Sequence, residues 1–93
     1  MKLLSNTFQH QEYIPERCAF GIKDTENHMA LGKNKNPQLI WSEIHEEAKS
    51  LVLICVDTDV PSSLDNFNKE GKTISKDLPR VNFYHWVMVD IKA

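Results

Sequence analysis

Two aspartates and a histidine are the residues of this chain whose types and spacing suggest chemistry. Asp57 and Asp59 follow an apolar run, Pro61 lies just beyond them, and His85 precedes a second apolar run. This set has three interpretations. Carboxylate and imidazole could form half of a divalent metal site, since these ligands suit Mg, Mn or Zn. They could also form an acid–base pair, or the aspartates could simply accept backbone N–H groups in a turn.

The composition restricts the classes of partner. The chain has 93 residues, of which 41% are hydrophobic and 26% charged, which suits one globular domain. Its 11 basic and 13 acidic side chains give a net charge of -2 without a long basic run. A nucleic-acid binder needs a concentrated positive face, so we expect no nucleic-acid partner.

The cysteines and the N-terminus bear on metal binding and location. Cys18 and Cys55 are far apart and lack the Cys/His spacing of a zinc site, so we expect no structural metal. Cys55 lies in an apolar run and is predicted to be a buried free thiol, which fits a reducing compartment. The first residues lack a signal-peptide apolar stretch, and no run approaches the roughly twenty residues that cross a bilayer. We therefore expect a cytoplasmic protein without a membrane span.

The elements that must position these residues are two apolar strands. Leu51–Val56 reads as a strand buried on both faces, ended abruptly by the aspartates, and Trp86–Val89 with Ile91 reads as a second strand opened by His85. Such strands joined by long loops predict an antiparallel, all-β protein. Of the rest, we expect a short strand at 38–41, surface loops at 24–36 and 62–80, a turn or a single helical turn at 42–49, and core positions for Trp41 and Trp86.

Several short motifs occur in one fixed order along the chain, and together they resemble the phosphatidylethanolamine-binding (Raf kinase inhibitor-like) family. The family signature is a D-P-D-x-P segment followed by an H-W or H-F pair, here Asp57 to Pro61 and His85-Trp86, with Thr58 in place of the usual proline. The segment between these motifs resembles a bacterial branch. The other matching motifs are Leu4-Ser5-x-x-Phe8, Ile14-Pro15, Asn36-Pro37-x-Leu39-x-Trp41 and Lys49-Ser50-Leu51-x-Leu53.

The resemblance implies a fold of which residues 1–93 form only a part. It implies an antiparallel β-sandwich in which residues 1–93 are the N-terminal portion of a single domain. Family members continue well beyond this point, with further strands and a Gly- and His-containing pocket loop. We therefore expect this β-sandwich to be incomplete without a C-terminal half. A second chain, either that half or another copy of this one, is expected to complete its edges.

The resemblance also implies a site. Asp57 and His85 match the family's pocket residues, Pro61 would shape the wall through a cis Val60–Pro61 bond, and Phe83 and Tyr84 would line the rim. His85 is the expected anion contact, because an imidazole N–H can donate to a phosphate oxygen. Asp57 would orient His85 or accept from a ligand amine or hydroxyl. Asp59 would be structural, accepting N–H groups of the turn.

The function implied is a non-catalytic binding module for phosphate- or carboxylate-bearing ligands such as phospholipid head groups, with no cofactor. The family also suggests inhibition of a kinase or a protease by surface docking. The alternative is a small hydrolase that uses Asp57 and His85, with or without a divalent metal. No activated nucleophile accompanies these two residues in the sequence, since neither cysteine has a histidine nearby.

Overall fold

The computed structural model describes residues 1–93, which divide into two units, Met1–Glu46 and Glu47–Ala93. Six β-strands and one short 3₁₀ helix make up the regular structure, and the strands pair into three two-stranded antiparallel sheets. The prediction of a mainly β, antiparallel protein is therefore confirmed. None of the helical structure is long and apolar enough to cross a membrane.

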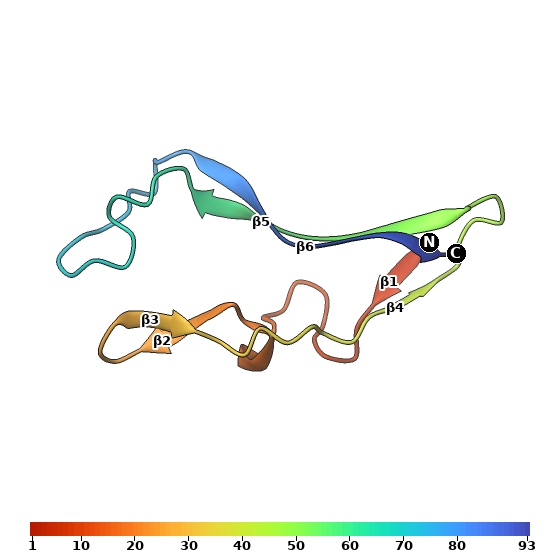
Figure 1. The fold of residues 1–93 in the computed structure, drawn as a ribbon, viewed down its shortest axis with the longest axis horizontal. Helices are drawn as coiled ribbons and strands as arrows, with labels where there is room; N and C mark the ends of the chain where they lie inside the picture. The colour runs from red at the N-terminus through yellow and green to blue at the C-terminus, as the bar shows by residue number, and fades with distance from the viewer. The chain divides into compact units, whose positions relative to one another are not determined.

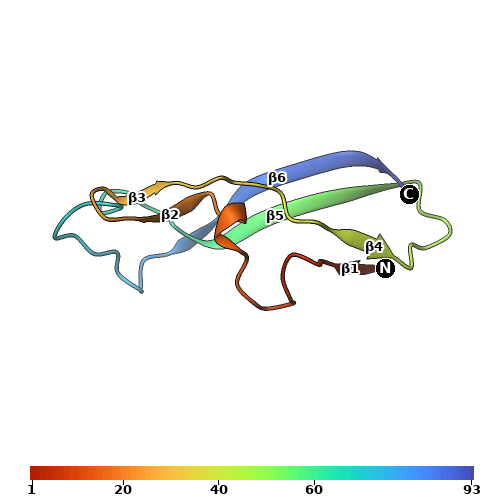
Figure 2. The ribbon, with the colours of Figure 1, turned by 90° about the horizontal axis from the view of Figure 1, so that it is seen from below.

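The first unit contains two of these sheets (Figure 2). Strand β1 (Lys2–Leu4) pairs with β4 (Ile40–Ser42), and β2 (Gly21–Asp24) forms a hairpin with β3 (His28–Leu31). The 3₁₀ helix η1 (Glu16–Cys18) precedes that hairpin. Residues 24–36 are thus not the continuous loop that their polar composition predicts.

Local hydrogen bonds explain the unexpected hairpin. The Asp24 carboxylate accepts the backbone N–H of Asn27 at 2.8 Å and so closes the turn, and His28 begins β3 with a positive φ of 65°. Such side-chain turns form from short polar sequences that otherwise read as a loop. Beyond β3, Gly32 N–H donates to the carbonyl oxygen of Phe20 at 2.7 Å, which continues the pairing of the two arms.

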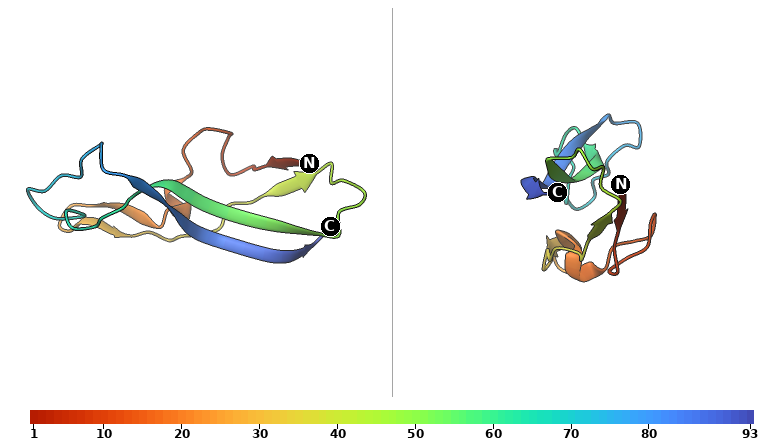
Figure 3. Two further views of the ribbon diagram at one scale, coloured as in Figure 1. Left: turned by 90° about the horizontal axis from the view of Figure 1, so that it is seen from above. Right: turned by 90° about the vertical axis from the view of Figure 1, so that its right-hand side faces the viewer.

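The second unit is one long hairpin. Strand β5 (Ser50–Pro61) pairs antiparallel with β6 (Arg80–Lys92), and the two run side by side as a twisted ribbon (Figure 1; Figure 3, left). Both strands are longer than predicted. The aspartates lie inside β5 and His85 lies in the middle of β6, so the expectation that they mark strand ends is wrong. Cross-strand pairing over this length overrides the low strand preference of Asp.

Burial within the chain is slight. Cys18 is the one buried hydrophobic residue, at 9% exposure, while Trp41 and Trp86 are half-buried. Along β5, Leu51 and Leu53 are half-buried and the residue between them is exposed, so the prediction that this strand is buried on both faces is wrong. A two-stranded ribbon has no second layer of its own to cover its faces, whereas a sandwich core needs two inner faces.

Three further local predictions can be checked. Cys55 is an exposed free thiol, so the prediction of a buried one is wrong. The Val60–Pro61 bond is trans, as are all peptide bonds of the chain, so the predicted cis bond is wrong. Pro61 is the last residue of β5 and pairs with Arg80, and extended pairing favours the commoner trans form. Of the turn or single helical turn predicted at 42–49, Ser42 instead ends β4, and the rest forms a turn without a helix.

Candidate functional site

The register of the long hairpin places three of the predicted site residues on one face. Asp57 is the cross-strand partner of Phe83, and partners in an antiparallel pair share a face. His85 is two residues from Phe83, and their rings meet edge to face with centroids 4.8 Å apart. We call Asp57, Phe83 and His85 the polar–aromatic face.

A β-bulge brings His85 to this position. Cys55 pairs with Trp86 and Val56 pairs with Tyr84, so His85 is an extra residue that no residue of β5 opposes. Bulges disrupt the ladder locally, increase its twist and re-aim side chains, and they are common next to functional sites. The ring of Phe83 supports the imidazole from one side at an interplanar angle of 64°. His85 is thereby presented from within the strand rather than from its end.

The two carboxylate oxygens of Asp57 have different roles: one stabilises the backbone, and the other can accept a hydrogen bond from a ligand. Its Oδ1 accepts the backbone N–H of Asp59 at 2.8 Å, an aspartate turn within the strand. The expectation that Asp59 would accept the turn N–H groups is therefore wrong, because Asp57 is the acceptor. The turn coincides with a second irregularity, where the register shifts between Asp57 and Val60. It fixes the direction of the Asp57 carboxylate and leaves Oδ2 for a second partner.

Asp59 is held instead by Arg80. The Arg80 guanidinium contacts the Asp59 carboxylate, with Nε 3.7 Å from Oδ1, and its Nη1 donates to the Asp59 carbonyl oxygen at 3.4 Å. Asp59 is 84% exposed, while the Arg80 side chain is only 30% exposed. An exposed ion pair alone contributes little stability, but the added backbone contact makes the geometry more specific.

The remaining two predicted site residues lie elsewhere on the hairpin. Tyr84 pairs with Val56, one residue along from Asp57 and Phe83, and consecutive strand residues face opposite sides. Tyr84 therefore lies on the other face from its neighbours. Pro61 ends the strand opposite Arg80 and is half-buried. The structure thus brings three of the five predicted residues together.

The possible metal ligands of the chain do not cluster. No three side chains of His, Cys, Asp or Glu lie together in a group that could hold a metal ion. A divalent ion at Asp57 and His85 would need further ligands from outside this set.

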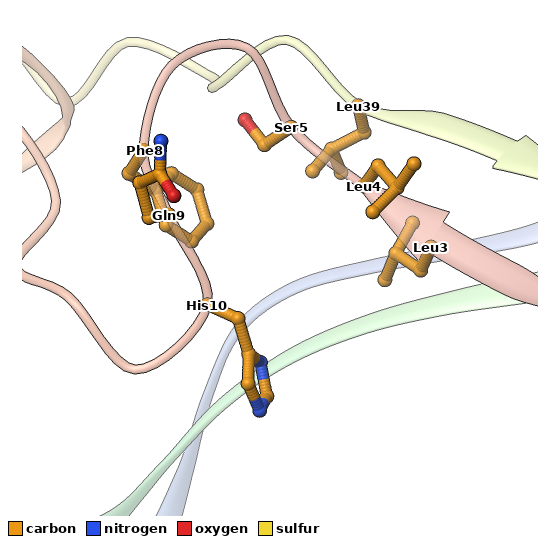
Figure 4. Close-up of a pocket in the computed structure, with 7 residues that line it drawn as sticks. All are labelled: Leu3, Leu4, Ser5, Phe8, Gln9, His10 and Leu39. Atoms are coloured by element: carbon orange, nitrogen blue, oxygen red, sulfur yellow. The ribbon is translucent and has the colours of Figure 1, made fainter.

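A pocket that the sequence did not predict lies in the first unit (Figure 4). Its volume is about 350 Å³, and none of the predicted site residues lines it. In Figure 4 the leucine side chains lie on one side and Phe8 with Gln9 on the other. The lining residues come from segments that are separate in the sequence, so no local sequence pattern predicts the pocket. The lining residues are Leu3, Leu4, Ser5, Phe8, Gln9, His10 and Leu39.

Comparisons with known proteins agree with the sequence motifs. A family model described as phosphatidylethanolamine-binding protein matches residues 4–93. The UPF0098 protein of Methanothermobacter thermautotrophicus (strain Delta H) is 36% identical over 64 residues, which make up 69% of this chain and 36% of that protein. The chain thus matches little more than a third of the length of this curated relative. No solved structure matches the chain.

Proposed function

Because the chain belongs to the phosphatidylethanolamine-binding protein family, we propose that its polar–aromatic face forms part of a non-catalytic binding site for a small anionic ligand. The ligand carries a phosphate or a carboxylate group. The observation that supports this proposal most is the common placement of Asp57, Phe83 and His85 on one face of the β5–β6 hairpin.

The role of His85 follows from its chemistry. A ring N–H of imidazole donates a hydrogen bond to a phosphate or carboxylate oxygen, and the bond is stronger when the imidazole is protonated. The edge-to-face contact with Phe83 restricts the ring, so less rotational freedom is lost when a ligand binds. His85 is therefore the anion contact of the proposed site.

The role of Asp57 decides the kind of ligand. A carboxylate beside a bare phosphate repels it, but the same carboxylate attracts an ammonium group. Since Oδ1 is engaged in the turn, Oδ2 is the oxygen that accepts from the ligand. A zwitterionic ligand with a phosphate and an amine a few atoms apart satisfies both residues. The phosphoethanolamine head group of a phospholipid has this composition.

The rest of the site and any protein partner lie beyond these three residues. The family resemblance implies further pocket segments that are not among residues 1–93. Docking of the assembled surface on a kinase or a protease is the interaction role that we attach to this proposal.

The proposal is tested by titrating the chain with O-phosphoethanolamine, inorganic phosphate and acetate, and by following amide shifts by NMR. His85→Ala is expected to weaken phosphoethanolamine binding by about ten- to a hundredfold, the effect of one charge-assisted hydrogen bond of about 1.5–3 kcal/mol. His45→Ala is the matched control, because it removes an imidazole from the other unit. Equal affinities of the unaltered chain and His85→Ala would remove His85 from the site.

A second variant tests the assignment of the amine. Asp57→Asn keeps the side-chain shape and removes its charge. We expect weaker binding of phosphoethanolamine and unchanged or tighter binding of inorganic phosphate. Release of inorganic phosphate from phosphoethanolamine by the unaltered chain, absent in both Asp57→Asn and His85→Ala, would instead support the hydrolase.

A further inference from the structure

The segment between β5 and β6 is an organised loop. Its two ends meet where Ser62 N–H donates to the carbonyl oxygen of Pro79 at 3.0 Å. Inside, Asn66 Nδ2 donates to the carbonyl oxygen of Thr73 at 3.0 Å and joins its two arms. A small cavity of about 250 Å³ lies between these arms. Close ends are also a feature of Ω-loops, although this loop is longer than most of them.

Arg80 lies at the neck of this loop and contacts both sides of it. Besides its two contacts with Asp59, its Nη2 lies 3.5 Å from the carbonyl oxygen of Ser75. Ser75 belongs to the returning arm of the loop, where its hydroxyl accepts the N–H of Asp77 at 3.1 Å. One guanidinium thus joins the loop to the strand segment that carries the aspartate turn.

We propose that Arg80 is a positioning residue for the anion site. The inference rests on the proposed function, since it concerns the same site. Arg80 holds the carbonyl oxygen of Asp59, and the N–H of Asp59 holds Oδ1 of Asp57. The direction of the Asp57 carboxylate therefore depends on a residue that does not lie on the polar–aromatic face. The loop arm at Ser75 is fixed to the same point.

The fork of the guanidinium is what this arrangement requires. Three acceptors, namely the Asp59 carboxylate, the Asp59 carbonyl and the Ser75 carbonyl, lie around one side chain. A planar group with five N–H donors can serve all three, whereas a lysine ammonium is a compact point charge at the end of a flexible stem. Arg80→Lys consequently keeps the charge but cannot make the three contacts at once.

The experiment compares Arg80→Gln and Arg80→Lys with Lys76→Gln. Lys76→Gln is the charge-matched control, because it removes one positive charge from the same loop while the three contacts of Arg80 at the neck stay in place. Two quantities are measured for each variant: hydrogen exchange and chemical shift of the Asp59 amide, and affinity for O-phosphoethanolamine. The Asp59 amide reports the turn whether or not a ligand is present.

We expect faster exchange of the Asp59 amide in both Arg80 variants, together with about three- to tenfold weaker phosphoethanolamine binding, the equivalent of one ordinary hydrogen bond. Lys76→Gln should change neither quantity. If Arg80→Lys retains full affinity, or if Lys76→Gln weakens binding as much as Arg80→Gln, Arg80 acts only as a charge and the inference is wrong. Failure of the unaltered chain to bind phosphoethanolamine refutes the proposed function, whereas unchanged exchange of the Asp59 amide in both Arg80 variants, with binding intact in the unaltered chain, refutes the inference alone.

Discussion

The face of the hairpin opposite the candidate site carries exposed apolar side chains, and they predict that this face associates with further polypeptide. Val52, Ile54 and Val56 alternate along β5 and so share a face, and Val87 and Tyr84, the partners of Ile54 and Val56, lie on the same side. The exposed fractions of these five residues are 57%, 52%, 39%, 53% and 57% in that order. We call them the apolar face.

The free energy at stake follows from these fractions. Full burial of a Val, Leu or Ile side chain contributes about 1.5–3 kcal/mol, and each of these residues has about half of that still to gain. The five together amount to about 4–7 kcal/mol, similar to the total stability of about 5–15 kcal/mol of a small domain. We therefore expect either a further part of the protein or another copy of this chain to cover this face.

The perturbation is Ile54→Glu, which places a charge at the centre of the apolar face. Alone at micromolar concentration, the unaltered chain is expected to have a mass above its own 10.8 kDa in multi-angle light scattering, and Ile54→Glu is expected to lower it. Leu31→Glu is the matched control, because Leu31 is 71% exposed on β3 in the other unit. Its effect on mass should be small.

A monomeric state of the unaltered chain would refute the prediction that its apolar face must be covered. If the unaltered chain scatters as a single copy and unfolds cooperatively in urea with the slope expected for its size, the hairpin needs no cover. Equal effects of Ile54→Glu and Leu31→Glu would show that added charge, and not this particular face, controls the association.

Two further predictions concern the first unit and the cysteines. A Cβ at Gly32 would overlap the carbonyl oxygen of Ala19, so Gly32→Ala should destabilise the β2–β3 hairpin by about 1–3 kcal/mol. The loss should appear as lower protection of its amides from hydrogen exchange. Gly21→Ala is the control, because a Cβ there closely approaches only the flexible side chain of Met29 and should destabilise the hairpin less. Cys55 is exposed and Cys18 is buried, so a thiol reagent should modify Cys55 first and Cys18 only on unfolding. Equal reaction rates in intact-mass measurements, or protection in Gly32→Ala equal to that of the unaltered chain, would contradict them.

The strand segments that are most apolar could be read from the sequence, but their limits could not. Leu51–Val56 and Trp86–Val89 lie inside β5 and β6, as their composition predicts. β5 continues beyond Val56 through Asp57, and β6 begins earlier than predicted, at Arg80. Both extensions depend on pairing between the two strands, which cannot be predicted from the sequence of either strand alone. The β2–β3 hairpin was missed for a related reason, since polar turns and short strands have similar compositions.

The candidate site was predictable in its residue types but not in its geometry. Asp57 and His85 were recognised from their motifs, yet their common face depends on the register between the strands. The loop that joins β5 and β6 is too long to fix that register by turn type, as a two-residue hairpin would. The separation of Tyr84 from Phe83 follows from strand alternation once the strand is known to include both. Before that, a rim position for each was the simpler hypothesis.

Replacement of His85 is expected to spare the hairpin, although His85 does not open its strand as predicted. If His85 opened a strand, its replacement would spare the fold because little packs around a strand end. His85 instead lies in the middle of β6, where most residues have a cross-strand partner that contributes to stability. The bulge lowers this cost, since no residue of β5 opposes His85.

The aromatic pair contributes to the remaining cost. His85→Ala removes the edge-to-face packing of the imidazole on the Phe83 ring, which is worth about 0.5–1.5 kcal/mol. This is small beside the stability of about 5–15 kcal/mol that a folded domain has. Weaker ligand binding with an unchanged pattern of hairpin amide shifts is therefore the signature of a site residue at this bulge. Unfolding of the hairpin in His85→Ala would show that the bulge serves the fold instead.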